Sequence, residues 1–140
     1  MSWRDRYVRL QAELDNMRRR WEQRLETETA NNRQEILRDM LPLADHLEMA
    51  LQHGAKLEGE QAKEYLRNIE ATSQAFLNTL KRYGVTPIEA QGQPFDPNVH
   101  EAIGQIQEGD VPSGNVAQVL QTGYIDGDKL LRPARVLVRE

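Results

Sequence analysis

A regular apolar stripe occupies the start of the chain and limits the folds that it can adopt. Its members are spaced alternately by four and three residues, and they are Trp3, Tyr7, Leu10, Leu14, Met17 and Trp21. This average period of 3.5 residues is typical of a coiled-coil seam. No proline or glycine precedes Pro42, so we expect a helix from Trp3 to about Met40, about 57 Å long at 1.5 Å per residue. A small domain cannot bury a stripe of that length, and the simplest partner is a second copy of the chain.

The flanks of this seam carry charges of both signs. The run Arg18–Arg20 is interleaved with acidic neighbours, among them Glu13, Asp15 and Glu22. Because the helix therefore has no basic face of any length, we interpret the run as a solvated coiled-coil flank and not as a nucleic-acid patch. A local docking site for an acidic protein surface is the alternative that this pattern leaves open.

The seam changes its character after Trp21. Leu25 follows by four residues instead of three, and the stripe is polar at Thr29 and Asn32 before Ile36 restores it. An insertion of this kind is a stutter, which locally unwinds a supercoil. We expect this weakened stretch to melt separately from the rest of the molecule, giving two heat transitions.

A helical hairpin is predicted next. The apolar positions broaden from Ile36 onward, and Pro42 is expected to kink or restart the helix. A polar turn at His53–Gly59 leads to a second helix from about Glu60 that ends at Gly84. Two such hairpins would close a four-helix bundle in the dimer. Dimer contacts are thus predicted at Tyr7, Leu10, Leu14, Met17, Trp21, Leu25, Ile36, Leu47, Leu66, Ile69 and Phe76.

The remainder of the chain is rich in β-formers, glycine and proline. Val116–Ile125 and Leu130–Val138 are each predicted as a strand, and Asp126-Gly127 between them predicts a hairpin with a type I′ turn. Pro133 is expected at an edge or a bulge. The fold class is therefore α+β. It comprises a coiled-coil stalk helix (1–40), a helical hairpin (41–86) and a small β-rich domain (87–140).

Composition and motifs indicate no enzyme. The chain has 140 residues, no cysteine and a net charge of -4. We therefore expect no disulfides, no cofactor and no nucleic-acid partner. No apolar run is long enough to cross a membrane and no secretory leader is visible, which predicts a cytoplasmic protein without a membrane partner. His100-Glu101 matches half of a zinc-protease motif, but position 104 is glycine instead of the second histidine, so no metal site is expected.

The order of these segments and three stretches of sequence resemble the GrpE family. The most specific stretch is Phe95–Ile103, which reads FDPNVHEAI. The second consists of Gly123-Tyr124, Asp128, Leu131–Val136 and Val138. The N-terminal Tyr7–Asn16, continuing into Arg18–Arg20, is also similar to the family's helix motif. The resemblance covers nearly the whole chain.

The resemblance implies a function and a set of contact residues. GrpE proteins are homodimeric nucleotide exchange factors whose β-domain inserts against the ATPase domain of a DnaK-type chaperone and accelerates ADP release. By position, the residues implied to contact the chaperone are Arg18, Leu120, Tyr124, Asp126, Gly127, Lys129 and Val138. Those implied to shape the loop at the start of the FDPNVHEAI stretch, called the signature loop below, are Phe95, Asp96, Pro97, His100, Gly123 and Arg132. For Gly123 we favour a bulge or a close backbone approach over direct contact.

Two other classes of protein fit parts of the pattern. A structural coiled-coil tether would dimerise without affecting nucleotide turnover. A small hydrolase using His100 and Glu101 would need a cleft that this composition scarcely permits.

Overall fold

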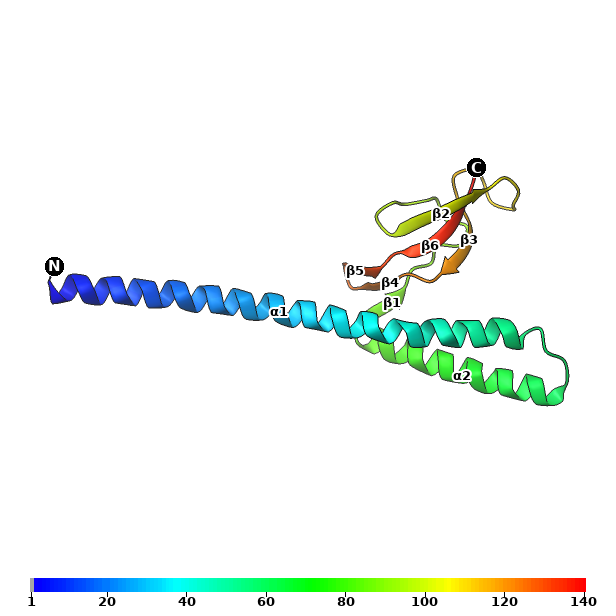
Figure 1. Ribbon diagram of the computed structural model, residues 1–140, viewed down its shortest axis with the longest axis horizontal. Coiled ribbons are helices and arrows are strands. Elements are labelled where there is room, and N and C mark those ends of the chain that lie inside the picture. The colour runs from blue at the N-terminus through cyan, green and yellow to red at the C-terminus, as the bar shows by residue number, and fades with distance from the viewer. Residues whose placement is uncertain (1) are drawn as a thin grey trace. The chain divides into compact units, whose positions relative to one another are not determined.

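The computed structural model describes residues 2–140, and the chain divides into two compact units, Met1–Leu37 and Arg38–Glu140. The predicted α+β class is confirmed, with two helices followed by six strands. The helices are α1 (Trp3–Gly54) and α2 (Glu60–Arg82). Figure 1 shows α2 running back alongside the C-terminal part of α1.

Helix α1 passes through Pro42 without interruption, so the restart expected there does not occur. Pro42 removes one backbone hydrogen bond, that to the carbonyl of Arg38, at a cost on the order of 3 kcal/mol. Leu41 and Ala44 on either side of it are 1% and 4% exposed. Burying these apolar side chains contributes a comparable amount, which allows the helix to continue.

The hairpin turn and the end of α2 follow the sequence pattern. Gly59 (φ 109°) precedes α2, and Gly84 (φ 88°) follows it in the left-handed conformation predicted for a C′ glycine. Gly54 ends α1 where a Cβ atom would lie 2.7 Å from Leu66 Cδ1. An alanine at position 54 would therefore have to displace the end of the Leu66 side chain where the last turn of α1 packs against α2.

The β-rich part consists of two three-stranded sheets. The first has the order β1-β4-β5 and is antiparallel, with strands Val85–Pro87, Tyr124–Asp126 and Lys129–Arg132. The second has the order β2-β6-β3, with strands His100–Ile106, Ala134–Arg139 and Val116–Gln121. In it β6 is parallel to β2 and antiparallel to β3.

Each of the two long strands predicted from the sequence is in fact two strands in different sheets. The chain leaves β3 at Thr122-Gly123 to enter β4, and it leaves β5 at Pro133 to enter β6. Proline cannot donate to a strand ladder and Gly123 has no side chain to pack, so both are suited to a crossing point. Pro133 thus separates two strands instead of lying within one.

The turn between β4 and β5 differs in type from the prediction. Asp126 pairs with Lys129 across a two-residue loop, which confirms the hairpin. Gly127 has φ 61°, whereas no non-glycine residue in the described part of the chain has a positive φ. A type I′ turn needs positive φ at both central residues, so the loop follows the II′ pattern with glycine first.

The core of the β-rich domain lies on one face of the β2-β6-β3 sheet. Ala90, Val116, Ala134 and Val136 are 2% exposed or less, and Ile88, Phe95, Val119 and Val138 pack against them. A second group of buried residues occupies the helical hairpin and the β1-β4-β5 sheet, namely Leu41, Ala44, Leu80, Val85, Tyr124 and Leu131.

Candidate interaction surfaces

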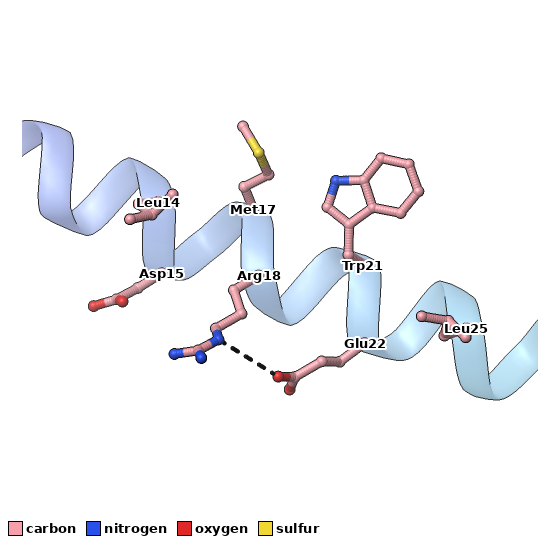
Figure 2. A pocket seen from close by; sticks show the side chains of 7 residues that line it. All are labelled: Leu14, Asp15, Met17, Arg18, Trp21, Glu22 and Leu25. Carbon is pink, nitrogen blue, oxygen red and sulfur yellow. Dashed lines mark ion pairs between the residues drawn. The ribbon is translucent and has the colours of Figure 1, made fainter.

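The predicted coiled-coil seam is exposed along the N-terminal part of α1. Figure 2 shows Met17 and Trp21 projecting to one side of the helix, while Arg18 and Glu22 lie on the other side and form an ion pair. Exposure of the seam side chains ranges from 47% at Met17 to 85% at Trp3. Full burial of a large apolar side chain contributes about 1.5–3 kcal/mol, so this stripe is a strong candidate for pairing with another helix.

The charged flanks of the seam are internally paired. Ion pairs with four-residue spacing join Arg9 to Glu13 (3.6 Å), Arg18 to Glu22 (3.8 Å) and Arg24 to Glu28 (3.7 Å). Their side chains are 65% or more exposed, and each such pair stabilises a helix by only about 0.2–0.5 kcal/mol. This geometry agrees with a solvated flank. The Arg18 side chain, which is predicted to contact the chaperone, is also accessible. Breaking its ion pair with Glu22 would cost only this small free energy.

The predicted contacts on the second helix and the end of the first are half-buried. Leu47, Leu66, Ile69 and Phe76 are all in this intermediate state, whereas Ile36 is 60% exposed. Half-buried apolar side chains on a two-helix hairpin are typical of a surface that a further pair of helices would cover.

The structure distributes the predicted chaperone contacts of the β-rich domain over both sheets. Leu120 on β3 is 49% exposed, and Gly127 and Lys129 at the tip of the β4-β5 hairpin are exposed as well. Asp126 is half-buried beside them. Val138 on β6 packs against the core of the β2-β6-β3 sheet, so only part of its side chain is accessible.

The prediction that Tyr124 contacts the chaperone needs a correction. Its side chain is only 1% exposed, so the ring is not available on the surface. The Arg132 guanidinium lies over it, with Cζ 5.4 Å from the ring centroid. Burial, together with the nearby Glu48 carboxylate, raises the pKa of the Tyr124 hydroxyl to about 12. Tyr124 is therefore part of the interior of the domain.

One exposed apolar residue of the β-rich domain was not predicted as a contact. Ile103 on β2 is 44% exposed. Strand β2 and strand β3, which carries Leu120, lie on either side of the central strand β6. The sequence signal was available, since Ile103 belongs to the FDPNVHEAI stretch. The resemblance, however, does not place Ile103 among the residues implied to contact the chaperone.

The signature loop is held together by hydrogen bonds centred on Asp96. Its backbone N–H donates to Nδ1 of His100 (3.0 Å), and its carbonyl accepts from the N–H of His100 (2.8 Å). The Asp96 carboxylate accepts from the N–H of Asn98 (3.0 Å). The His100 ring is 6% exposed and contacts the Phe95 ring, with centroids 5.9 Å apart. His100 thus bridges the loop by accepting a hydrogen bond through Nδ1.

Gly123 lies at a very close backbone approach. A Cβ atom there would be 2.4 Å from the backbone nitrogen of Ala134 and 2.8 Å from the carbonyl carbon of Pro133. The two points where the chain crosses between sheets therefore touch each other. No side chain larger than hydrogen fits between them.

Arg132 makes its contacts away from the signature loop with which the resemblance grouped it. It donates from Nε to the carbonyl of Thr122 (2.9 Å) and from both terminal nitrogens to the carboxylate of Asp45 on α1. The sequence contains no signal for this pairing, because 87 residues separate the two partners.

Residues 2–140 contain no group of three or more His, Asp or Glu side chains arranged to hold a metal ion, and none of their helices is long and apolar enough to cross a membrane. Adjacent residues of a strand point to opposite faces, so His100 faces the interior while Glu101 is exposed. These two side chains do not form a catalytic pair.

An exposed helical seam, a helical hairpin with half-buried apolar side chains and a β-rich domain with an exposed hairpin tip define the chain as an α+β protein. The GrpE family model matches residues 1–140. The chain is 42% identical over 137 residues to Protein GrpE of Allorhizobium ampelinum and 41% identical over 135 residues to Protein GrpE of Geobacillus thermodenitrificans. These alignments cover 95% and 96% of the chain and 67% and 60% of the two relatives. The chain belongs to the GrpE family, as its sequence motifs indicated.

Proposed function

We propose that the chain acts as a cytoplasmic homodimer that binds the ATPase domain of a DnaK-type chaperone, opens its nucleotide cleft and accelerates ADP release. Membership of the GrpE family over the full 140 residues is the observation that carries this proposal. Two of the three stretches on which the resemblance rested, Phe95–Ile103 and the set from Gly123 to Val138, fold into the β-rich domain, which offers exposed Leu120 and Lys129. Its contact residues are proposed to be Leu120, Asp126, Gly127, Lys129 and the accessible part of Val138, with Arg18 on the stalk.

The dimer is proposed to form through the exposed seam and the open face of the hairpin. Pairing of two α1 helices would cover the side chains that Figure 2 shows projecting from one side. Two hairpins would then meet through Leu47, Leu66, Ile69 and Phe76, giving a four-helix bundle. The stalk (1–40), hairpin (41–86) and β-rich domain (87–140) are proposed as the working parts of this assembly.

The proposed action depends on a difference in affinity between two states of the chaperone. An exchange factor shifts the cleft toward opening only as far as it binds the open state better than the nucleotide-closed state. A hundredfold weakening of ADP binding corresponds to about 2.7 kcal/mol of such preference. No covalent chemistry is needed, and charge on Lys129 would pair with an acidic chaperone surface.

Binding to the isolated chaperone, measured by calorimetry with and without ADP, tests the proposal. We expect much tighter binding to the nucleotide-free chaperone, and Lys129→Glu should weaken it. Lys56→Glu makes the same charge change in the exposed turn between α1 and α2 and should leave the affinity unchanged. Equal affinity for the two nucleotide states would contradict exchange activity, and dimerisation without any binding would favour a structural tether.

A further inference from the structure

One face of α1 is polar where it meets the β-rich domain. Arg38, Leu41, Asp45 and Glu48 are spaced by three, four and three residues, so they lie along one side of the helix. Of these four only Leu41 is apolar. The other three members carry charged side chains, which lie beside the buried Leu41.

The charged groups meet partners on and between strands β3, β4 and β5. Asp45 pairs with Arg132 through both carboxylate oxygens, with 2.8 Å between Oδ2 and Nη1. Glu48 accepts a hydrogen bond from the Thr122 hydroxyl (2.9 Å). Arg38 donates from Nε to the carbonyl of Leu131 (2.8 Å). Three separate side chains of α1 thus reach the segment where the chain changes sheets.

Arg132 is the central residue of this set. Its side chain is 18% exposed and that of Asp45 is 24% exposed, so the pair is largely shielded from water. The remaining Nε–H of Arg132 is satisfied by the Thr122 carbonyl, and the guanidinium covers the Tyr124 ring. A planar, bidentate pair with its other donor fixed holds one geometry much more strictly than an apolar contact of similar size.

We propose that Asp45, Glu48, Thr122 and Arg132 form a polar latch that fixes the orientation of the β-rich domain on α1, and that Asp45 and Arg132 are positioning residues for nucleotide exchange. The second part rests on the function proposed above. The latch holds the β4-β5 hairpin and Leu120 in one orientation. Binding to the chaperone then does not have to restrict the orientation of the domain, which lowers the entropic cost of binding. Loosening the latch should then weaken productive binding more than it lowers the maximal exchange rate.

The latch can be tested in the full chain without any partner. The sequence contains no cysteine, so spin labels at Gln52→Cys on α1 and Ser113→Cys in the β-rich domain report one intramolecular distance when labelled chains are diluted with unlabelled protein. We expect a narrow distance distribution for the otherwise unchanged chain and a broad one after Asp45→Asn or Arg132→Gln. The double variant should broaden the distribution by less than the sum of the two single effects, because both remove the same pair.

Matched variants separate the latch from general effects of charge. Asp39→Asn removes the same charge from an exposed position of α1 and should leave the distribution narrow. Glu48→Gln keeps an oxygen that can accept from the Thr122 hydroxyl and should broaden it only slightly. Circular dichroism of each variant verifies that the helices and sheets are intact. An unchanged, narrow distribution in folded Asp45→Asn and Arg132→Gln would overturn the latch.

Exchange kinetics test the positioning role. We expect Asp45→Asn to raise the protein concentration needed for half-maximal ADP release about tenfold, with a smaller change in the maximal rate. A broad distance distribution with unchanged exchange kinetics would overturn the positioning role. If the unaltered chain itself fails to accelerate ADP release, the proposed function is wrong, while the distance measurement still decides whether the latch exists.

Discussion

At the scale of single residues, Gly123 shows how a backbone crossing depends on the absence of a side chain. Gly123→Ala would place a methyl group 2.4 Å from the Ala134 nitrogen, and neither backbone segment can move without disturbing a sheet. We expect a loss of about 2–4 kcal/mol in the free energy of unfolding. Gly109→Ala is the matched control, since its Cβ would meet its nearest neighbours only at 3.9 and 4.0 Å. Urea denaturation of both variants measures the difference, and equal stabilities would contradict the close approach.

The Tyr124 hydroxyl gives a prediction about pH. Its pKa is raised from the ordinary value of 10 to about 12, chiefly by burial. Because the folded state favours the protonated phenol, the resulting stability is fully present below pH 10 and is lost as the pH rises toward 12. Ultraviolet titration should therefore show a phenolate component with a midpoint near 12 that is missing from Tyr124→Phe. A wild-type curve that matches that of Tyr124→Phe, apart from one tyrosine's amplitude near pH 10, would contradict the buried position.

At the scale of secondary-structure elements, the seam of α1 makes dimerisation testable. Leu14→Glu places a charge in the centre of the stripe, and we expect the stalk helices to separate because burying an unpaired carboxylate is costly. Ala12→Glu adds the same charge on the side of the helix opposite the seam and should have little effect. Sedimentation velocity combined with circular dichroism checks both variants. Identical behaviour of the two would contradict pairing through this stripe.

The polar stretch of the stalk predicts separate melting. Thr29 and Asn32 interrupt the apolar stripe between Leu25 and Ile36, so we expect two thermal transitions, the lower one from the stalk. Replacing both by leucine should raise the lower midpoint and leave the upper one in place. Asn31→Leu, one position away from the stripe, serves as the control. Calorimetry that shows one cooperative transition would contradict the idea of a thermally sensitive stalk.

The helices were readily predicted from the sequence, whereas the strands were predicted only in part. The seam depends on the local spacing of apolar residues, and the limits of α2 depend on the glycines that flank it. Both signals are visible in the sequence. The division of two apparent strands at Thr122-Gly123 and Pro133 was missed, because an unbroken run of β-formers does not show that the chain changes sheets. Continuation of α1 through Pro42 was missed for a related reason, since it depends on tertiary burial of Leu41 and Ala44.

The contact residues of the candidate surfaces were also predicted only in part. Exposure of Leu120 and Lys129 agrees with the expected contact surface, while burial removed Tyr124 from it. Composition and motif position cannot tell an exposed tyrosine from a buried one. The Asp45–Arg132 pair was not predicted at all, because nothing local relates residues 87 positions apart.

At the scale of the whole molecule, the separate surfaces are proposed to serve one activity. The seam and hairpin would hold two chains together, and the latch would orient the β-rich domain that carries the proposed contact residues. None of these parts requires a catalytic group. What the assembly must supply is a preference for the open state of its partner.

Release of a fluorescent ADP analogue from a bacterial DnaK-type chaperone, followed by stopped flow with and without this protein, tests that claim most directly. We expect acceleration by at least tens-fold, reduced by Lys129→Glu and unaffected by Lys56→Glu. An unchanged release rate in the presence of a folded dimer that binds the same chaperone would contradict the account.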